Sequence, residues 1–155
     1  MRVRISGILV GAVLLGCTDP VGPSPALSAE DQLALQIVPH LEWRTGADHP
    51  ATITSAQVER QTLHLMVEYG GGCATHRFAL VAGTELGESL PPYTVLRLAH
   101  DGNGDPCRAL LGKQLEVDLS PILPLVNQSG GSALRFILVE PGERVSTMGE
   151  LLVTF

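Results

Sequence analysis

The sequence predicts an all-β fold, an antiparallel β-sandwich or a small barrel of about seven strands. Three observations predict it: apolar residues at every second position in several short segments, turns rich in glycine and proline between them, and few charges. Apolar residues make up 45% of the 155 residues and charged residues 17%, so the chain can bury a core. Alternation with a period of two is typical of strands that have one buried face.

Several segments carry this strand pattern. In the clearest of them, residues 62–69, Leu63, Leu65 and Val67 share one face, and three glycines follow. The other segments alternate over shorter stretches and are also bounded by turn residues. Strands are therefore expected at residues 52–58, 62–69, 76–81, 93–99, 108–119, 134–139 and 151–155.

Two further segments depart from the strand pattern. Residues 28–38 are expected to form one short helix, because Ser28 can cap it and Leu33, Ile37 and Val38 recur at helical spacing. Residues 120–126 contain two prolines, which favours a turn or a single 3₁₀ turn. Trp43 is interpreted as a core residue near the start of the domain.

The N-terminus has the pattern of an export signal. Arg2 and Arg4 precede a short apolar run, Ile8 to Leu15, that contains no acidic residue. The run is shorter than the roughly 20 apolar residues that an ordinary membrane-spanning helix needs. Residues 1–16 are therefore predicted to be a signal peptide that is removed on export.

The end of this run, Leu14-Leu15-Gly16-Cys17, resembles the lipobox of bacterial lipoproteins, a resemblance that covers residues 1–17 only. It implies that Cys17 is acylated and becomes the first residue of the mature protein. Several acyl chains hold firmly, since each buried CH₂ contributes about 0.8 kcal/mol. The residue after Cys17 is Thr18. In the enterobacterial pattern an Asp at this position favours the inner membrane, so Thr18 implies the outer membrane, facing the periplasm or the cell surface.

Residues 17–29 are expected to carry the lipid and to form a tether rich in Pro, Ser and Gly, and residues 30–155 to form the β-rich domain. Removing the two positive charges of Arg2 and Arg4 from a net charge of −6 leaves −8. So acidic a chain is a poor partner for nucleic acid and is repelled by anionic headgroups. Attachment to a membrane must then depend on the lipid on Cys17.

Export also decides how the other two cysteines are interpreted. In an oxidising compartment Cys73 and Cys107 are most simply a disulfide. A disulfide holds its two Cα atoms about 5 to 6 Å apart. Residues close to either cysteine are then expected in one patch: His76, His100, Asp101 and Asp105.

This patch admits a structural and a metal-binding interpretation. Structurally, glycines and the side chains of Asp101 and Asn103 form turns that the disulfide joins. Asp101, Asn103 and Asp105 also resemble the start of a calcium loop, although Pro106 and Gly112 stand where an EF-hand needs Gly and Glu. Two other sets of metal ligands stay open: reduced Cys73 and Cys107 with His76 and His100 for zinc, or the two histidines with Asp101 or Asp105 for zinc or copper.

Catalytic motifs are missing from the sequence. It contains no Cys-x-x-Cys motif of redox enzymes and no Gly-x-Ser-x-Gly motif of serine hydrolases. His76 or His100 could form an acid–base pair with Asp101, but no nucleophile accompanies such a pair. His40, His49 and His64 are isolated and are interpreted as surface or core residues. We therefore expect no enzyme and no required cofactor. The predicted function is a membrane-anchored module that binds an envelope or protein partner or supports the envelope; the alternative is a small exported metal-binding domain.

Overall fold

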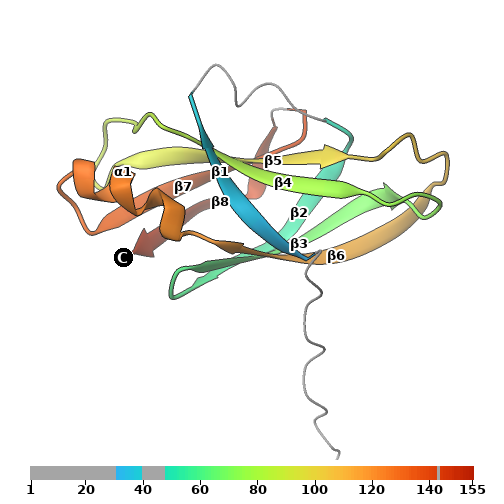
Figure 1. The fold of residues 1–155 in the computed structure, drawn as a ribbon, viewed down its shortest axis with the longest axis horizontal. Coiled ribbons are helices and arrows are strands. Elements are labelled where there is room, and N and C mark those ends of the chain that lie inside the picture. Colours follow the sequence, from blue (N-terminus) through green and yellow to red (C-terminus); the bar gives the residue numbers. More distant parts are fainter. Residues whose placement is uncertain (1–30, 40–47, 143) are drawn as a thin grey trace, which may run out of the picture.

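The computed structural model describes residues 31–39, 48–142 and 144–155. In these residues the chain forms eight strands, one 3₁₀ turn and one short helix (Figure 1). Their bounds are β1 Gln32–Val38, β2 Ala51–Glu59, β3 Thr62–Gly71, β4 Arg77–Gly83, β5 Tyr93–Asp101, β6 Ala109–Asp118, η1 Ser120–Ile122, α1 Leu123–Gln128, β7 Ala133–Glu140 and β8 Arg144–Thr154.

The all-β class is confirmed, and each of β2 to β8 overlaps one of the seven predicted segments, although β8 begins at Arg144, well before the predicted start at Leu151. Leu63, Leu65 and Val67 of β3 are all buried, as their shared face requires. The same inward alternation continues at the end of the neighbouring strand β6, where Leu115 and Val117 are buried, whereas β5 is buried continuously from Leu96 to His100. One core therefore fills the interior of the sheet.

The eight strands form a single sheet that curls into a nearly closed barrel, in the order β2-β3-β6-β1-β4-β5-β7-β8 (Figure 1). Of the two predicted architectures, the structure thus selects the barrel. The edge strands β2 and β8 share no ladder within the described residues. We call the junction between β2 and β8 the seam. Here the backbone N–H of Ile53 in β2 donates a hydrogen bond of 3.0 Å to Oε1 of Glu140, a buried residue at the end of β7.

The predicted helix over residues 28–38 is wrong for its described part, because residues 32–38 form β1. Leu33, Leu35 and Ile37 fit a period of two as well as Leu33, Ile37 and Val38 fit a helix. Hydrogen bonding to neighbouring strands decides between helix and strand, since β1 completes the sheet between β6 and β4. Tertiary contacts override a weak local preference here.

The predicted antiparallel pairing is also corrected, because the sheet is mixed. β1 runs parallel to both β4 and β6, and β5 runs parallel to β7. The first residues of β1 pair with β6 and its later residues with β4. β1 therefore joins two groups of strands, β2-β3-β6 and β4-β5-β7-β8.

The segment after β6 contains the predicted 3₁₀ turn, which continues into α1. Its apolar side chains Ile122, Leu125 and Val126 join the core. Within the described residues no helix is long and apolar enough to cross a membrane. The predictions for the signal peptide, Cys17, the tether, His40 and Trp43 fall on residues outside those that the structure describes.

Candidate functional site

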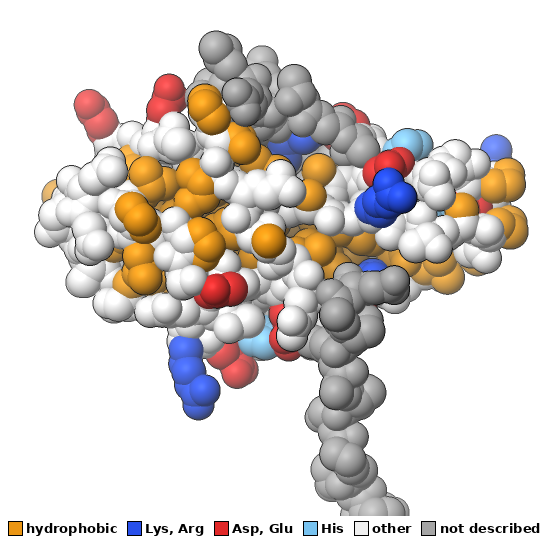
Figure 2. Space-filling view, in the orientation of Figure 1, with side chains coloured by type: hydrophobic (Ala, Val, Ile, Leu, Met, Phe, Trp, Pro, Cys, Tyr) orange, Lys and Arg blue, Asp and Glu red, His pale blue; other side chains and the backbone are white. Residues whose placement is uncertain are grey.

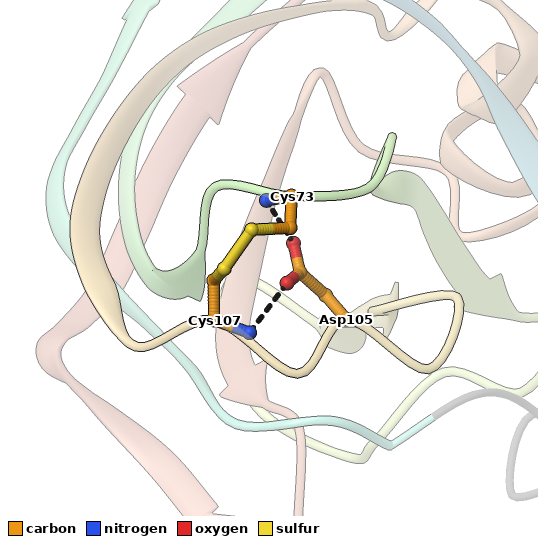
Figure 3. Close-up of side chains that lie close together, drawn as sticks. All are labelled: Cys73, Asp105 and Cys107. Atoms are coloured by element: carbon orange, nitrogen blue, oxygen red, sulfur yellow. Dashed lines mark hydrogen bonds between the residues drawn. A yellow bond between two sulfur atoms is a disulfide. The ribbon is translucent and has the colours of Figure 1, made fainter.

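Two loops at one end of the barrel are joined by the predicted disulfide. Cys73 lies in the β3–β4 loop, residues 72–76, and Cys107 in the β5–β6 loop, residues 102–108. Their Cα atoms are 5.7 Å apart and their sulfurs are bonded (Figure 3). We call these two segments the bridged loops. Their cysteines are 34 positions apart in sequence, so the disulfide closes a long loop of chain.

Asp105 links the bridged loops a second time. Its Oδ1 accepts a hydrogen bond of 2.8 Å from the backbone N–H of Cys107 in its own loop. Its Oδ2 accepts from three successive backbone N–H groups of the other loop, those of Gly72, Cys73 and Ala74, at 2.8–2.9 Å. Figure 3 shows the carboxylate between the two cysteines. Successive N–H groups of this kind form a small anion-binding nest, which Asp105 fills.

The carboxylate of Asp105 is held in its ionised form. Burial disfavours the charge, with the side chain only 2% exposed. Hydrogen bonds from His76 and from the backbone N–H groups of Cys107, Ala74 and Cys73 outweigh this effect, and they hold the pKa of Asp105 well below its usual range. Asp105 therefore acts as an acceptor only.

A chain of hydrogen bonds runs from Asp105 into the barrel wall. His76 Nε2 lies 3.0 Å from Asp105 Oδ2, and His76 Nδ1 lies 2.8 Å from His100 Nε2. His100 Nδ1 lies 3.1 and 3.2 Å from the backbone carbonyl oxygens of His49 and Pro50. His76 belongs to a bridged loop, whereas His100 belongs to strand β5. The histidine pair, His76 and His100, thus ties the bridged loops to the sheet and to the segment before β2.

Burial also changes the acidity of His100, which is 1% exposed. Desolvation lowers its pKa, and the neighbouring His76 and His49 lower it further, while hydrogen bonds to the carbonyls of His49 and Pro50 partly oppose this. His100 therefore resists becoming an imidazolium.

Two aromatic rings surround the histidine pair, and their place there was not predicted from the sequence. Phe78 lies opposite His100 in the β4–β5 register and stacks on it with ring centroids 4.5 Å apart. Tyr69 lies with its centroid 4.7 Å from His76 and 5.2 Å from His100. The available signals were the position of Tyr69 directly before the glycine triplet and that of Phe78 two residues after His76.

Of the four residues predicted for the patch, His76, His100 and Asp105 come together, and Asp101 does not join them. Asp101 Oδ1 accepts a hydrogen bond of 2.9 Å from the backbone N–H of Asn103, which is the turn that the structural interpretation expected. Its nearest ionisable partner is the exposed His49, with Nδ1 at 4.0 Å from Asp101 Oδ1. Asp101 therefore shapes the β5–β6 turn.

The same geometry bears on the metal hypothesis, which stays a prediction. Among the described residues, Cys73, Asp105 and Cys107 place possible ligand atoms within 4.8 Å of one another. The two sulfurs, however, are bonded to each other. The ring nitrogens of the histidine pair point toward each other and toward Asp105 and backbone carbonyls. These donor atoms satisfy one another rather than converging on an empty centre.

A hollow of about 400 Å³ opens over this cluster, lined in part by His49, Gly70, His76, His100 and Arg108. The histidine pair lies at its floor, since His100 and the His76 side chain are almost fully buried. The hollow places the imidazoles close to solvent without exposing their nitrogens.

No protein-family model matches the chain, and no curated protein matches it in sequence. Among solved structures, it is similar to a protein of unknown function from Bacteroides vulgatus, with a TM-score of 0.51 and 14% identity over 80% of this chain and 56% of that one. It is similar to a NigD-like immunity protein from Bacteroides caccae, with a TM-score of 0.51 and 16% identity over 78% of this chain and 58% of that one. A protein from Bacteroides fragilis named as a candidate lipoprotein gives a TM-score of 0.50 and 14% identity over 80% and 68%.

The chain thus spans less than two thirds of the first two of these proteins. At such identities the likeness shows the fold alone, a β-rich barrel that other bacterial proteins share.

Proposed function

We propose that this chain is an exported, lipid-anchored protein whose disulfide-linked barrel is a non-enzymatic module that binds an envelope partner or supports the envelope. One observation carries the proposal: the polar cluster at the end of the barrel is satisfied within the protein. Both oxygens of Asp105 and all four ring nitrogens of the histidine pair lie within hydrogen-bonding distance of protein atoms.

This satisfied cluster argues against acid–base or nucleophilic chemistry at the hollow. A general base needs a lone pair directed at the substrate, and a cysteine nucleophile needs a free thiolate. Here the imidazole nitrogens face partners inside the protein, and Cys73 is bonded to Cys107. The same arrangement stiffens the bridged loops, which suits a module that presents a fixed surface.

Export and lipid anchoring have separate support. A disulfide persists in oxidising compartments outside the cytoplasm. The segment Leu14 to Cys17 supplies the lipobox-like sequence, and a neighbour of the same fold is named as a candidate lipoprotein. On the face drawn in Figure 2 the described basic side chains are isolated from one another, so this face offers no basic patch for anionic lipid. The anchor would then be the lipid on Cys17, with the outer membrane as the expected site.

The proposal is tested by expressing the full chain and its Cys17→Ser variant in a bacterium and separating membrane from soluble fractions. We expect the wild-type chain in the membrane fraction with acyl chains on its N-terminal peptide, and the variant as an unacylated protein outside the membrane fraction. Thr18→Ala is the matched control, because it changes the next residue and keeps the cysteine. A Cys17→Ser protein that stays fully with membranes would show that the anchor is elsewhere.

Intact mass spectrometry of the exported protein tests the module itself. With a disulfide between Cys73 and Cys107, the mass is two hydrogens below that of the reduced chain under native and denaturing conditions. A full thiol mass with one metal ion retained only under native conditions would instead favour the metal-binding alternative.

A further inference from the structure

The hydrogen-bond chain at the end of the barrel fixes the number of protons on the histidine pair. A backbone carbonyl only accepts, so His100 Nδ1, 3.1 Å from the carbonyl oxygen of His49, must carry a hydrogen. Asp105 is an ionised acceptor that already takes backbone N–H donors, so His76 Nε2, at 3.0 Å from Oδ2, must carry one as well.

One further hydrogen is needed between the two rings. His76 Nδ1 and His100 Nε2 lie 2.8 Å apart, a distance at which one nitrogen must donate and the other accept. The four ring nitrogens therefore hold three hydrogens, whereas two neutral imidazoles would hold two. With three hydrogens the pair would carry one positive charge, and the carboxylate of Asp105, 3.0 Å from His76 Nε2, is the group placed to balance it.

A second extra proton does not fit this arrangement. It would set an N–H of His76 against an N–H of His100 across 2.8 Å and place two positive rings side by side. The surroundings add little compensation. Among the described residues, the other ionisable groups near the pair are Tyr69 from β3, the exposed His49 before β2, and Asp101, which lies 4.0 Å from His49 Nδ1; Arg108 lines the same hollow.

We propose that the histidine pair is a proton-sensitive tether, which holds one shared proton near neutral pH and releases the bridged loops from the barrel wall when a second proton binds. His76 is the member that moves, because it lies in a loop, whereas His100 is fixed in β5 between stacked Phe78 and the carbonyls before β2. The bridged loops stay joined to each other through the disulfide and through Asp105. Acid would therefore shift them as one unit and widen the hollow above His100, while the sheet stays folded. This device does not depend on the proposed lipid anchor.

Nuclear magnetic resonance of the full chain in detergent micelles, with ¹⁵N-labelled histidine and a chelator present, counts these hydrogens directly. Near neutral pH we expect hydrogens on His100 Nδ1 and His76 Nε2, and a third, strongly downfield one shared between the other two nitrogens. Peaks are assigned by their loss in His76→Gln and His100→Gln. Two neutral rings with two hydrogens in total would overturn the proposal.

Acidification from about pH 7 to about pH 4, across the range in which histidine titrates, tests the release. We expect the amide peaks of Gly72 and Gly104, one in each bridged loop, to move together with the histidine peaks, while those of core strands stay in place. His76→Gln should abolish this loop response. His64→Gln is the matched control, because His64 lies away from the cluster beside Glu116 and should leave the response intact. Loop peaks that stay fixed after both rings are fully protonated, or that move equally in His76→Gln, would show that the pair is not the tether.

Discussion

Asp105 and Gly71 show how single residues set the geometry of the bridged loops. Asp105 reaches its backbone donors only because the β3–β4 loop passes close to it, and His76 packs against the same stretch of backbone. A Cβ on Gly71 would overlap His76 Nε2 and lie 3.0 Å from Asp105 Oδ2. Gly71 is thus the position in the glycine triplet that requires the smallest residue, and it does so for lack of space rather than for backbone freedom.

Gly71→Ala should therefore lower the free energy of unfolding by about 1–3 kcal/mol, as overpacking of a filled site typically does. The imidazole of His76 would have to leave its place between Asp105 and His100. Urea denaturation measures the change. Gly70→Ala is the matched control, since a Cβ there meets nothing within 4 Å, and we expect it to change stability by less than about 0.5 kcal/mol. Equal losses in the two variants would contradict this account.

At the scale of elements, the seam of the barrel depends on a side chain. β2 and β8 are edge strands without a shared ladder in the described residues, and a register shift lies between Ile53 and Ser55 of β2. Glu140 satisfies the backbone N–H of Ile53 at this point. Because Ile53 is fully buried, its N–H would otherwise lack a partner inside the protein.

Glu140→Ala should cost about 1–3 kcal/mol of stability, because it leaves a buried donor unsatisfied. Glu140→Gln keeps an acceptor oxygen of similar reach and should cost less. Amide hydrogen exchange adds a local measurement, in which the amide of Ile53 should exchange faster in Glu140→Ala than in the wild type. If the exchange of Ile53 were the same in all three proteins, Glu140 would not close the seam.

Period-two alternation was enough to locate seven strands, although it found only the last part of β8, because the pattern is clear in strands such as β3 that bury one face. It could not predict β1, because Leu33, Leu35 and Ile37 serve a helix or a strand equally well until the partners β4 and β6 are known. It could not predict parallel pairing either, which depends on long-range topology rather than on local pattern.

The candidate site, too, was only partly predictable from the sequence. Predicted export to an oxidising compartment indicated the disulfide between Cys73 and Cys107, which the structure contains. Because a disulfide holds its two loops close together, it also indicated that His76, His100 and Asp105 lie near one another. The nest of N–H groups, the link between the two imidazoles and the separation of Asp101 depend on loop conformation, which residue types alone do not specify.

At the scale of the whole molecule, two buried groups make stability depend on pH. The pKa of His100 in the folded protein lies below its ordinary 6.5. On acidification His100 is therefore protonated in the unfolded chain before it is protonated in the folded protein, and stability falls as the pH drops from about 6.5. The native pKa of Asp105 lies below its ordinary 3.8, so a second loss follows as the pH drops below that value.

We therefore expect the free energy of unfolding to decline on acidification in two steps, measured by urea denaturation at a series of pH values. Asp105→Asn should lower stability at neutral pH and remove the lower step, because it no longer ionises. His100→Gln should flatten the upper step and keep the lower one. A stability that does not change between about pH 6.5 and about pH 4.5 in the wild type would contradict the role given to His100.

The place of β1 in the sheet has a mechanical consequence. Any pull on the chain ahead of Gln32 reaches a strand whose first residues pair with β6 and whose later residues pair with β4, both in parallel. Such a load acts along the strand and shears several hydrogen bonds at once, instead of unzipping them singly. Extracting β1 would divide the sheet into its two groups of strands. A tension applied at the N-terminal side is thus passed to β6 and β4 together, and its rupture force would report on both groups of strands.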